Sequence, residues 1–250
     1  MSRLAVDMRR ALDPAALAED VGMLPDPWQA EVMRTAALRV LLNCCRQSGK
    51  STTCALKAVH VAVYEPESVI LLLSPSQRQS QELFRKVLAV YKSLGRPVPS
   101  EGENALSLTL ENGSRVVSLP GTESTVRAYS AVRLLIVDEA ARVPDDVIAA
   151  VRPMLAVSGG QLIALSTPFG RRGWWYEAWE HGGKSWQRVR IPATDCPRIS
   201  PDFLDEERAA LGPWFFDQEY GCEFGDTEAA AFASEDIAAM FREDVKTWTV

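Results

Sequence analysis

The stretch CCRQSGKST, Cys44 to Thr52, carries the residue types that hold a phosphate chain. It matches the pattern G-x-x-x-x-G-K-[ST] at its second glycine, lysine and hydroxyl positions. In such a loop, backbone N–H groups and the following helix face the phosphates, the lysine contacts the β and γ phosphates, and the hydroxyl can ligate Mg²⁺. The predicted phosphate-binding residues are therefore Arg46, Gln47, Ser48, Gly49, Lys50, Ser51 and Thr52, with Ser51 also a Mg²⁺ ligand.

Cys44 stands where the pattern has its first glycine. Glycine is used where φ must be positive, so a cysteine predicts an ordinary strand-like conformation for this residue. The apolar run RVLLN before the loop and the helically spaced apolar residues of STTCALKAVHVAVY after it indicate a strand, a loop and a helix. The alternative is a polar turn that contains GKS without binding phosphate.

A pair of carboxylates follows another apolar run, in RLLIVDEAARVP. A buried strand that ends in this way places Asp138 beside the Mg²⁺ ion, while Glu139 can orient and deprotonate an attacking water. Taken alone, the same pattern also fits a core strand followed by a helix cap. Together with the GKS loop, it predicts ATP hydrolysis.

Two further stretches add candidate residues. In LIALSTPFG, Ser166 and Thr167 end a predicted strand, where an α/β sheet binds its ligand, so they could sense the γ-phosphate and couple its loss to movement. They could instead only satisfy a strand-end turn. In PDPWQAEVM, the Gln29 amide can pair with both the donor and the acceptor of adenine, whereas Trp28 is expected to be a core anchor.

Composition sets the class of protein. The chain has 250 residues, of which 47% are hydrophobic and 24% charged, and a net charge of −6. This is typical of a soluble globular chain, and the negative charge requires any DNA contact to be local or shared. Five cysteines, two of them adjacent, favour a reducing cytoplasm over a disulfide framework. Without a signal-peptide core or an apolar run of about 18 residues, neither export nor a membrane span is expected.

The elements that must position these residues follow from short apolar runs at 40–44, 69–73, 133–137 and 161–165. Such runs, alternating with helical patterns, predict buried parallel strands. Between them, NALSLTLENGSRVVSLP predicts a hairpin that turns at Asn112-Gly113 and extends the sheet with antiparallel strands. Helices are predicted near 50–63, 76–92, 145–154, 172–181, 202–210 and 214–220.

Five stretches, taken in order, resemble a known family: PWQ, CRQSGKST, VRAYSAVRLLIVDEAA, LSTPFGRRGWWYEAW and DQEYGCEFGD. Over about residues 25–226 the chain resembles the ATPase domain of the large terminase subunit, the DNA-packaging motor of tailed bacteriophages. The resemblance implies an α/β P-loop NTPase of the additional-strand, RecA/ASCE-like type, with a mainly parallel central sheet flanked by helices. The family often lacks the first loop glycine, so Cys44 is a permitted variant.

The resemblance also divides the chain. It implies a P-loop ATPase core over residues 1–171, a small lid-like helical subdomain over 172–228, and a tail over 229–250 that leads toward a nuclease domain. Large terminases carry that RNase H-like domain in addition, and we expect it to be missing here, so no nuclease activity is expected.

The resemblance gives roles to arginines that spacing alone cannot assign. Arg46 matches the loop arginine proposed to assist catalysis in cis, and Arg127 matches the finger that reaches a neighbouring subunit's γ-phosphate. Ala128 replaces the family's glycine, and the spacing from Arg127 to Glu139 is one residue longer than in the family, so Arg133 is an alternative finger. Each arginine could instead form a surface salt bridge.

The resemblance further implies ATP and Mg²⁺ as cofactors. The implied partners are double-stranded DNA, the portal protein, the small terminase subunit and other copies of the chain. The copies are expected to form a homo-oligomeric ring, a pentamer, on the procapsid, whereas the chain is expected to be a monomer in solution. The expected location is the host cytoplasm, at the procapsid portal, with no membrane contact. Arg171 and Arg172 beside Trp174-Trp175-Tyr176 could form a DNA-contacting strip, although helical spacing places the aromatic residues in the core.

Two other functions fit some of these residues. A superfamily 2 helicase-like, nucleic-acid-dependent ATPase also has an upstream Gln, a GK[ST] loop, a DEA ending and an ST motif, but it needs a second RecA-like domain, which we do not expect after residue 226. A nucleotide-binding scaffold would bind ATP tightly and not hydrolyse it.

Overall fold

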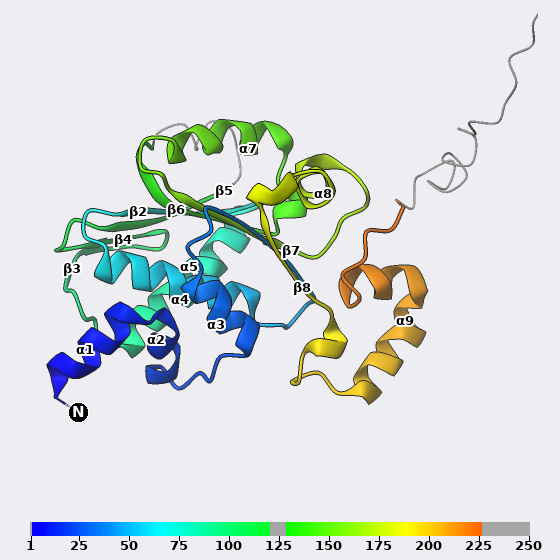
Figure 1. Ribbon diagram of the computed structural model, residues 1–250, viewed down its shortest axis with the longest axis horizontal. Helices are drawn as coiled ribbons and strands as arrows, with labels where there is room; N and C mark the ends of the chain where they lie inside the picture. Colours follow the sequence, from blue (N-terminus) through cyan, green and yellow to red (C-terminus); the bar gives the residue numbers. More distant parts are fainter. Residues whose placement is uncertain (1, 121–128, 227–250) are drawn as a thin grey trace, which may run out of the picture.

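The computed structural model describes residues 2–120 and 129–226 (Figure 1). Its centre is an eight-stranded sheet with the order β3-β4-β5-β2-β6-β7-β1-β8. The strands are β1 (Arg39–Cys44), β2 (Val69–Ser74), β3 (Ser100–Glu103), β4 (Ser107–Leu110), β5 (Arg115–Pro120), β6 (Val132–Asp138), β7 (Gln161–Ser166) and β8 (Gln187–Ile191). All neighbouring strands pair in parallel except β3 with β4 and β4 with β5. The predicted mainly parallel α/β sheet is therefore confirmed.

The helices lie on both faces of this sheet. They are α1 (Arg3–Leu12), α2 (Pro14–Asp20), α3 (Pro27–Arg34), α4 (Lys50–Tyr64), α5 (Gln77–Ser93), α7 (Asp145–Val151), α8 (Gly173–Glu180) and α9 (Pro201–Glu219), with short 3-10 turns between some of them. Figure 1 shows α3, α4 and α5 below the sheet and α7 and α8 above it. This is the layered arrangement of an α/β fold.

Side chains of each central strand alternate between two hydrophobic cores, because successive residues of a strand point to opposite faces. Leu42 of β1 and Ile136 of β6 belong to the core between the sheet and helices α4 and α5. Leu41 and Val137, their neighbours in sequence, belong to the core between the sheet and helices α7 and α8. The central strands are thus buried on both faces, as their continuous apolar sequences predict.

The hairpin at Asn112-Gly113 forms as predicted, and Gly113 has a φ of 82° that suits glycine. The Asn112 side chain donates hydrogen bonds to the Ala62 and Val63 carbonyls, which ties the turn to the end of α4. Of its two strands, only β4 runs antiparallel to its sheet neighbours, because β5 pairs in parallel with β2. Only β4 therefore runs against the direction of the parallel strands, because β3 in turn pairs antiparallel with β4.

Strand β8 was not predicted, and it lies within the segment from residue 172 that was expected to form a small helical subdomain. It pairs in parallel with β1 and forms one edge of the sheet, with Leu42 opposite Val189. Its sequence, QRVRI, alternates apolar and charged residues over only one short segment. The pairing with β1 is what makes this segment a strand.

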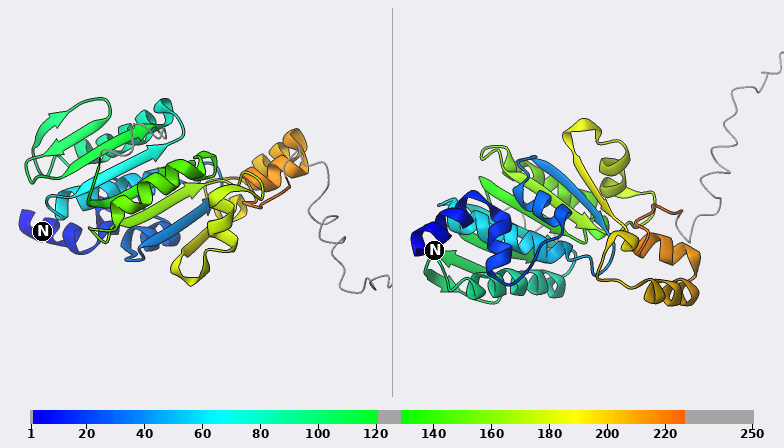
Figure 2. Two further views of the ribbon diagram at one scale, coloured as in Figure 1. Left: turned by 90° about the horizontal axis from the view of Figure 1, so that it is seen from above. Right: turned by 60° about the horizontal axis from the view of Figure 1, so that its bottom comes forward.

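Helix α9 lies beside the end of the sheet rather than over one of its faces (Figure 2). It was predicted as two helices, and the structure has a break at that place: Gly212 has φ 77° and ψ 162°, and Pro213 follows. A small core joins α9 to the rest of the molecule through Cys45, Cys196, Phe216 and Tyr220. The C-terminal half of α9 is therefore packed against the start of the phosphate-binding loop.

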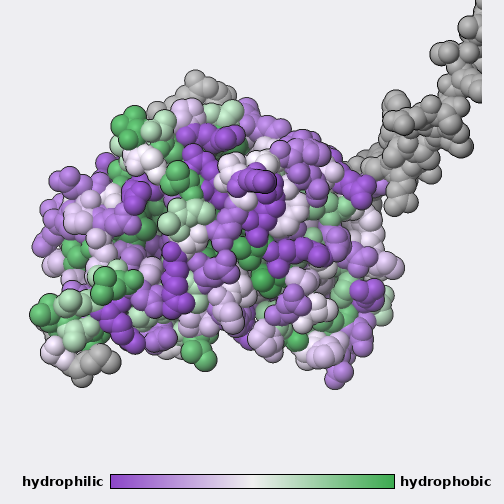
Figure 3. All heavy atoms as spheres, in the orientation of Figure 1, coloured by the Kyte–Doolittle hydropathy of each residue, from purple (hydrophilic) through white to green (hydrophobic). Residues whose placement is uncertain are grey.

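The surface shown in Figure 3 is mostly hydrophilic, with small separate hydrophobic areas. All five cysteines are free and buried. Trp175 is only 1% exposed, so the aromatic cluster of α8 contributes to the core as predicted. Within the described part of the chain, no helix combines the length and the apolar character needed to cross a membrane.

Candidate nucleotide site

The predicted site residues come together because β1, β6 and β7 are neighbouring parallel strands. Parallel strands end at the same edge of the sheet, and here Asn43 of β1 lies opposite Ser166 of β7, while Asp138 of β6 lies opposite Leu165. The loop after β1, the carboxylates after β6 and the hydroxyls after β7 therefore meet at the carboxyl edge. This is where open α/β sheets bind their ligands.

The phosphate-binding loop begins as the cysteine predicts. Cys44 is the last residue of β1 and is fully buried, which confirms its strand-like conformation. Farther along, Gln47 has a φ of 60° and Gly49 a φ of 90°. Its backbone conformation favours glycine, and a Cβ atom on Gly49 would come within 2.6 Å of the Gln29 Nε2 atom and would displace that side chain.

Lys50 is the first residue of α4, and its side chain folds back over the loop. Its ammonium group donates hydrogen bonds to the carbonyl oxygens of Cys44, at 3.0 Å, and Cys45, at 3.4 Å. The residue is only 7% exposed, so the positive charge is held inside the loop that starts the helix. The helix N-terminus and this charge together form an anion-binding arrangement.

Ser51 and Asp138 face each other across the same space, and the Ser51 hydroxyl donates to Asp138 Oδ2 at 3.3 Å. Burial, and next the charge of Glu139, raises the pKa of Asp138, whereas the charge of Lys50 opposes this shift. A hydroxyl and a carboxylate suit Mg²⁺, which prefers oxygen ligands and usually takes one or two carboxylates together with substrate phosphates. The pair therefore suits the predicted Mg²⁺ ion.

Glu139 follows Asp138 in the left-handed backbone region, with φ 50° and ψ 44°. This conformation is uncommon for a non-glycine residue, and such residues gather at functional sites. The Glu139 amide donates to Asp138 Oδ1 at 3.0 Å, and its carboxylate accepts a hydrogen bond from Arg142 at 3.1 Å. Asp138 therefore contacts Ser51, whereas the Glu139 carboxylate contacts Arg142.

Gln29 connects the start of α3 with the phosphate-binding loop. Its Oε1 accepts from the Asp26 amide, in a capping box at the start of α3, and its Nε2 donates to the Ser48 carbonyl at 3.2 Å. The residue is 1% exposed. The predicted contact with adenine would therefore require both hydrogen bonds to be exchanged. Trp28, by contrast, packs partly buried against the core, as predicted for a core anchor.

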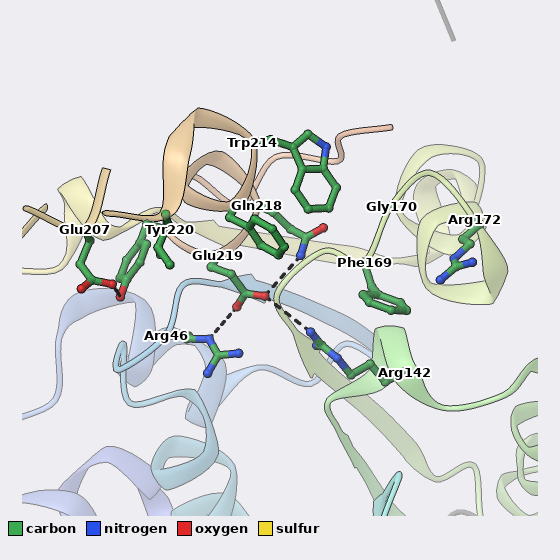
Figure 4. A pocket seen from close by; sticks show the side chains of 12 residues that line it. Arg46, Arg142, Phe169, Gly170, Arg172, Glu207, Trp214, Gln218, Glu219 and Tyr220 are labelled. Carbon is green, nitrogen blue, oxygen red and sulfur yellow. Dashed lines mark hydrogen bonds and ion pairs between the residues drawn. The ribbon is translucent and has the colours of Figure 1, made fainter. Parts of the chain in front are cut away.

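Arg46 points from the loop toward α9 and forms an ion pair with Glu219 at 2.7 Å (Figure 4). Glu219 also accepts a hydrogen bond from the Thr167 hydroxyl at 3.2 Å and lies 3.5 Å from an Arg142 nitrogen. Burial would raise the pKa of Glu219, but the hydrogen bond and charge of Arg46, followed by Gln218 and Arg142, bring it below its usual value. This carboxylate therefore stays charged and joins three parts of the site.

Several buried polar atoms at the carboxyl edge have no hydrogen-bond partner within residues 2–120 and 129–226. They include Asn43 Oδ1, Ser74 Oγ and Ser166 Oγ, at or beside the ends of β1, β2 and β7. Buried polar groups are normally paired, so unpaired ones mark places where water, an ion or a ligand is bound. Ser166, predicted to sense the γ-phosphate, is one of these residues, and its sensing role stays a prediction.

Three of the other arginines singled out from the sequence, Arg133, Arg171 and Arg172, lie within the described residues. Arg127 lies outside the described residues. Arg133 lies at the amino end of β6, the end opposite Asp138, where it pairs with Glu65. Arg171 donates to the Phe224 carbonyl, and the Arg172 guanidinium lies 4.9 Å from the centre of the Phe169 ring.

Sequence reasoning missed three residues of this site: Arg142, Glu219 and Ser74. Arg142 lies one helical turn after Glu139, a spacing that could have indicated their contact. Glu219 lies in the DQEYGCEFGD stretch, which was noted only as a mark of resemblance. Ser74 ends an apolar run in the same way as Ser166, so the same argument could have included it.

Comparisons with known proteins agree with this geometry. The family described as "Terminase large subunit, T4likevirus-type, N-terminal" matches residues 41–239. A curated large terminase subunit from Thermus phage G20c is 27% identical over 269 aligned positions, which cover 93% of this chain and 55% of the relative. The chain spans about half the length of the curated relatives it matches.

Solved structures show the same fold. The large terminase ATPase domain of Thermus phage P74-26 superposes with a TM-score of 0.73 at 24% identity, covering 83% of this chain and 96% of that one. The large terminase of another thermophilic bacteriophage, in complex with ADP, superposes with a TM-score of 0.68 at 14% identity, covering 79% and 53%.

Proposed function

Since this chain belongs to the family of terminase large subunit N-terminal domains, we propose that it is the ATP-hydrolysing motor domain that drives double-stranded DNA into phage procapsids. One observation carries the proposal. Lys50, Ser51, Asp138 and Glu139, which come from two distant parts of the sequence, lie at one edge of a parallel sheet, with Ser51 and Asp138 in contact.

The residues divide the chemistry by position. The amide groups at the start of α4 and the Lys50 ammonium bind the β and γ phosphates of ATP, which places the γ-phosphate next to the carboxylates. Ser51 and Asp138 would hold Mg²⁺, which when bound neutralises charge on the phosphates. Glu139 orients the attacking water and accepts its proton. Arg46 lies in the loop and can add positive charge where the transferring phosphoryl group develops negative charge.

The end of β7 would couple ATP hydrolysis to movement of α9. Ser166 and Thr167 lie at the carboxyl edge, and Thr167 already contacts Glu219 of α9. We assign to them the role of passing the loss of the γ-phosphate to α9. Because β8 belongs to the central sheet, the lid-like unit that we propose within residues 172–228 is centred on α9.

The wider assembly follows from the family. In our proposal, the chain is a monomer in solution and forms a pentameric ring at the procapsid portal in the host cytoplasm. The ring works with the portal protein and the small terminase subunit. Arg127 of one subunit completes the site of its neighbour. ATP and Mg²⁺ are the cofactors of each site.

The experiment that tests this function is the steady-state ATPase rate at increasing protein concentration with Mg²⁺, for the wild-type chain and Arg127→Ala, with Glu139→Gln as the blank. We expect a specific rate that climbs with concentration and collapses in Arg127→Ala, by a factor on the order of 10³ if this arginine acts as a finger. A rate that is independent of concentration and survives the substitution would contradict the ring, because each chain would then be self-sufficient.

A further inference from the structure

The carbonyl oxygen of Ser48, in the middle of the phosphate-binding loop, accepts hydrogen bonds from two side chains. Gln29 Nε2 donates to it at 3.2 Å, and Arg198 Nη2 donates to it at 2.9 Å. The two donors come from distant parts of the chain, because Gln29 belongs to α3 whereas Arg198 lies in the segment between β8 and α9. Ser48 itself is fully buried. Two separate segments therefore fix the direction of this one peptide group.

Asp26 joins the two donors into one network. Its carboxylate accepts two hydrogen bonds from Arg198, at 2.9 and 2.8 Å, and its amide donates to Gln29 Oε1 at 2.9 Å. The hydrogen bonds thus close a ring through Asp26, Gln29, the Ser48 carbonyl and Arg198. A bidentate pair between a carboxylate and a guanidinium fixes the plane of the guanidinium. Asp26, Gln29 and Arg198 together form a carbonyl clamp on the loop.

The conformation of the loop shows why the direction of this peptide group matters. Gln47 and Gly49, on either side of Ser48, have positive φ values of 60° and 90°. Left-handed residues in such a turn direct successive N–H groups into one concavity, which binds anions. A carbonyl oxygen that rotated into this concavity would repel a phosphate, because it carries partial negative charge. The phosphate site therefore needs the Ser48 oxygen to be held elsewhere.

Gly49 leaves the room that the clamp needs. A Cβ atom at this position would lie 2.6 Å from Gln29 Nε2 and 3.9 Å from Arg198 Nη2. Both donors thus approach the loop on the side where the glycine has no side chain. The loop sequence and the clamp are therefore matched to each other.

We propose that Arg198 is a positioning residue for nucleotide binding, which as part of the carbonyl clamp keeps the Ser48 oxygen away from the phosphates of ATP. The inference rests on the proposed function, since it takes ATP as the ligand of the loop. Arg198 acts through the loop and needs no contact with the nucleotide. Its loss weakens the binding of the phosphates and leaves the chemical step, which depends on Glu139, unchanged.

The first test is Arg198→Ala, measured by equilibrium titration with a fluorescent ATP analogue. We expect Kd to rise about tenfold, because the Ser48 carbonyl loses its charged donor and the loop is no longer preorganised. In steady-state hydrolysis KM for ATP should rise as well, while kcat stays within about threefold of the wild type. Competition by tripolyphosphate, which has neither base nor ribose, should weaken by the same factor as competition by ATP.

The matched control is Arg190→Ala. The Arg190 side chain is 44% exposed, against 46% for Arg198, and it also contacts one carbonyl, that of Gly221, and one carboxylate, that of Glu223. These partners do not belong to the phosphate-binding loop, so Kd for the ATP analogue should equal that of the wild type. Thermal unfolding checks that both variants fold.

A second substitution, Asp26→Asn, separates positioning from direct attraction of ATP by the charge of Arg198. Direct attraction predicts tighter ATP binding, because the negative charge beside the guanidinium is removed. The carbonyl clamp predicts the opposite, a rise in Kd of about threefold, because asparagine cannot form the bidentate charged pair. The sign of the change in Kd therefore distinguishes the two roles.

Arg198→Lys takes the place of Arg198→Ala if the alanine variant does not fold. Lysine keeps the charge but cannot hold a carboxylate and a carbonyl in fixed geometry, so Kd should rise about threefold. Wild-type affinity in a folded Arg198 variant, a fall in kcat alone, a smaller factor for tripolyphosphate than for ATP, or tighter binding by Asp26→Asn would overturn the inference. A wild-type chain that binds ATP and never hydrolyses it would instead overturn the proposed function.

Discussion

The two ends of the parallel sheet differ in how completely their buried polar groups are hydrogen-bonded. At the amino end, the Lys57 ammonium donates to the carbonyls of Met33 and Thr35, both at 2.9 Å, and the Gln161 amide donates to those of Thr35 and Ala37. At the carboxyl end, by contrast, the Ser74 and Ser166 hydroxyls are buried and have no partner within residues 2–120 and 129–226.

The contrast teaches that buried polar residues alone do not identify a functional site. Lys57 and Lys50 are both 7% exposed and lie on the same helix, α4. Lys57 closes the end of α3 and the segment before β1, so its hydrogen bonds serve the fold. Lys50 lies instead at the helix N-terminus beside two carboxylates and free hydroxyls. The difference predicts that substitutions at the carboxyl end change activity and those at the amino end change stability.

The largest expected effect is that of Glu139→Gln at the carboxyl end. We expect ATP binding to persist while kcat falls by at least about 10²-fold, because the amide cannot accept the proton of the attacking water. Thermal unfolding should match the wild type, and binding of a fluorescent ATP analogue checks the retained affinity. Turnover near that of the wild type would remove Glu139 from its role.

At the amino end, Lys57 should make stability depend on pH. Burial lowers the pKa of Lys57 to about 8 from its ordinary 10.5. Between these values the unfolded chain binds more protons than the folded one, so the free energy of unfolding rises with pH. From about pH 7 to about pH 10, this gain should be between about 2 and 3 kcal/mol for the wild type relative to Lys57→Met, measured by urea unfolding.

The control for Lys57 is Lys184→Met, which removes an exposed lysine and should leave the pH dependence of stability as in the wild type. ATP hydrolysis by Lys57→Met should stay within about twofold of the wild type, since the substitution lies at the structural end of the sheet. Parallel stability curves for the wild type and Lys57→Met would contradict this account of the buried ammonium.

The smallest expected effect is that of Arg133→Ala. Arg133 and Glu65 form an ion pair whose side chains are 43% and 37% exposed, and such pairs contribute less than about 1 kcal/mol. We expect little change in unfolding and none in the ATPase rate. A concentration-dependent rate that collapses in this variant would make Arg133 the trans-acting arginine and would give the amino end a catalytic role.

The core of the site could be predicted from sequence because it obeys a simple geometric rule. Lys50, Asp138 and Ser166 each follow or end an apolar run, each run forms a buried parallel strand, and such strands end at one edge. The loop conformation at Cys44 follows in the same way from the properties of glycine. These conclusions need only local patterns and one rule about parallel sheets.

The rest depends on tertiary contacts. Strand β8 exists because β1 offers it an edge, and Glu219 reaches the site only because α9 packs back against the phosphate loop. For Gln29, a local signal was present: Asp26 and Gln29 have the spacing of a capping box. That signal predicts a Gln29 amide occupied by the backbone, which competes with its predicted contact with adenine.

The burial of the five cysteines has a practical consequence for following α9 in solution. Thiolates are the reactive form, and burial raises the pKa of Cys45 to about 11 and that of Cys222 to about 12. Native thiols will therefore react slowly with maleimide dyes. A single added cysteine, such as Glu206→Cys on the exposed side of α9, can carry a fluorophore in the otherwise unaltered chain and report the position of this helix during turnover.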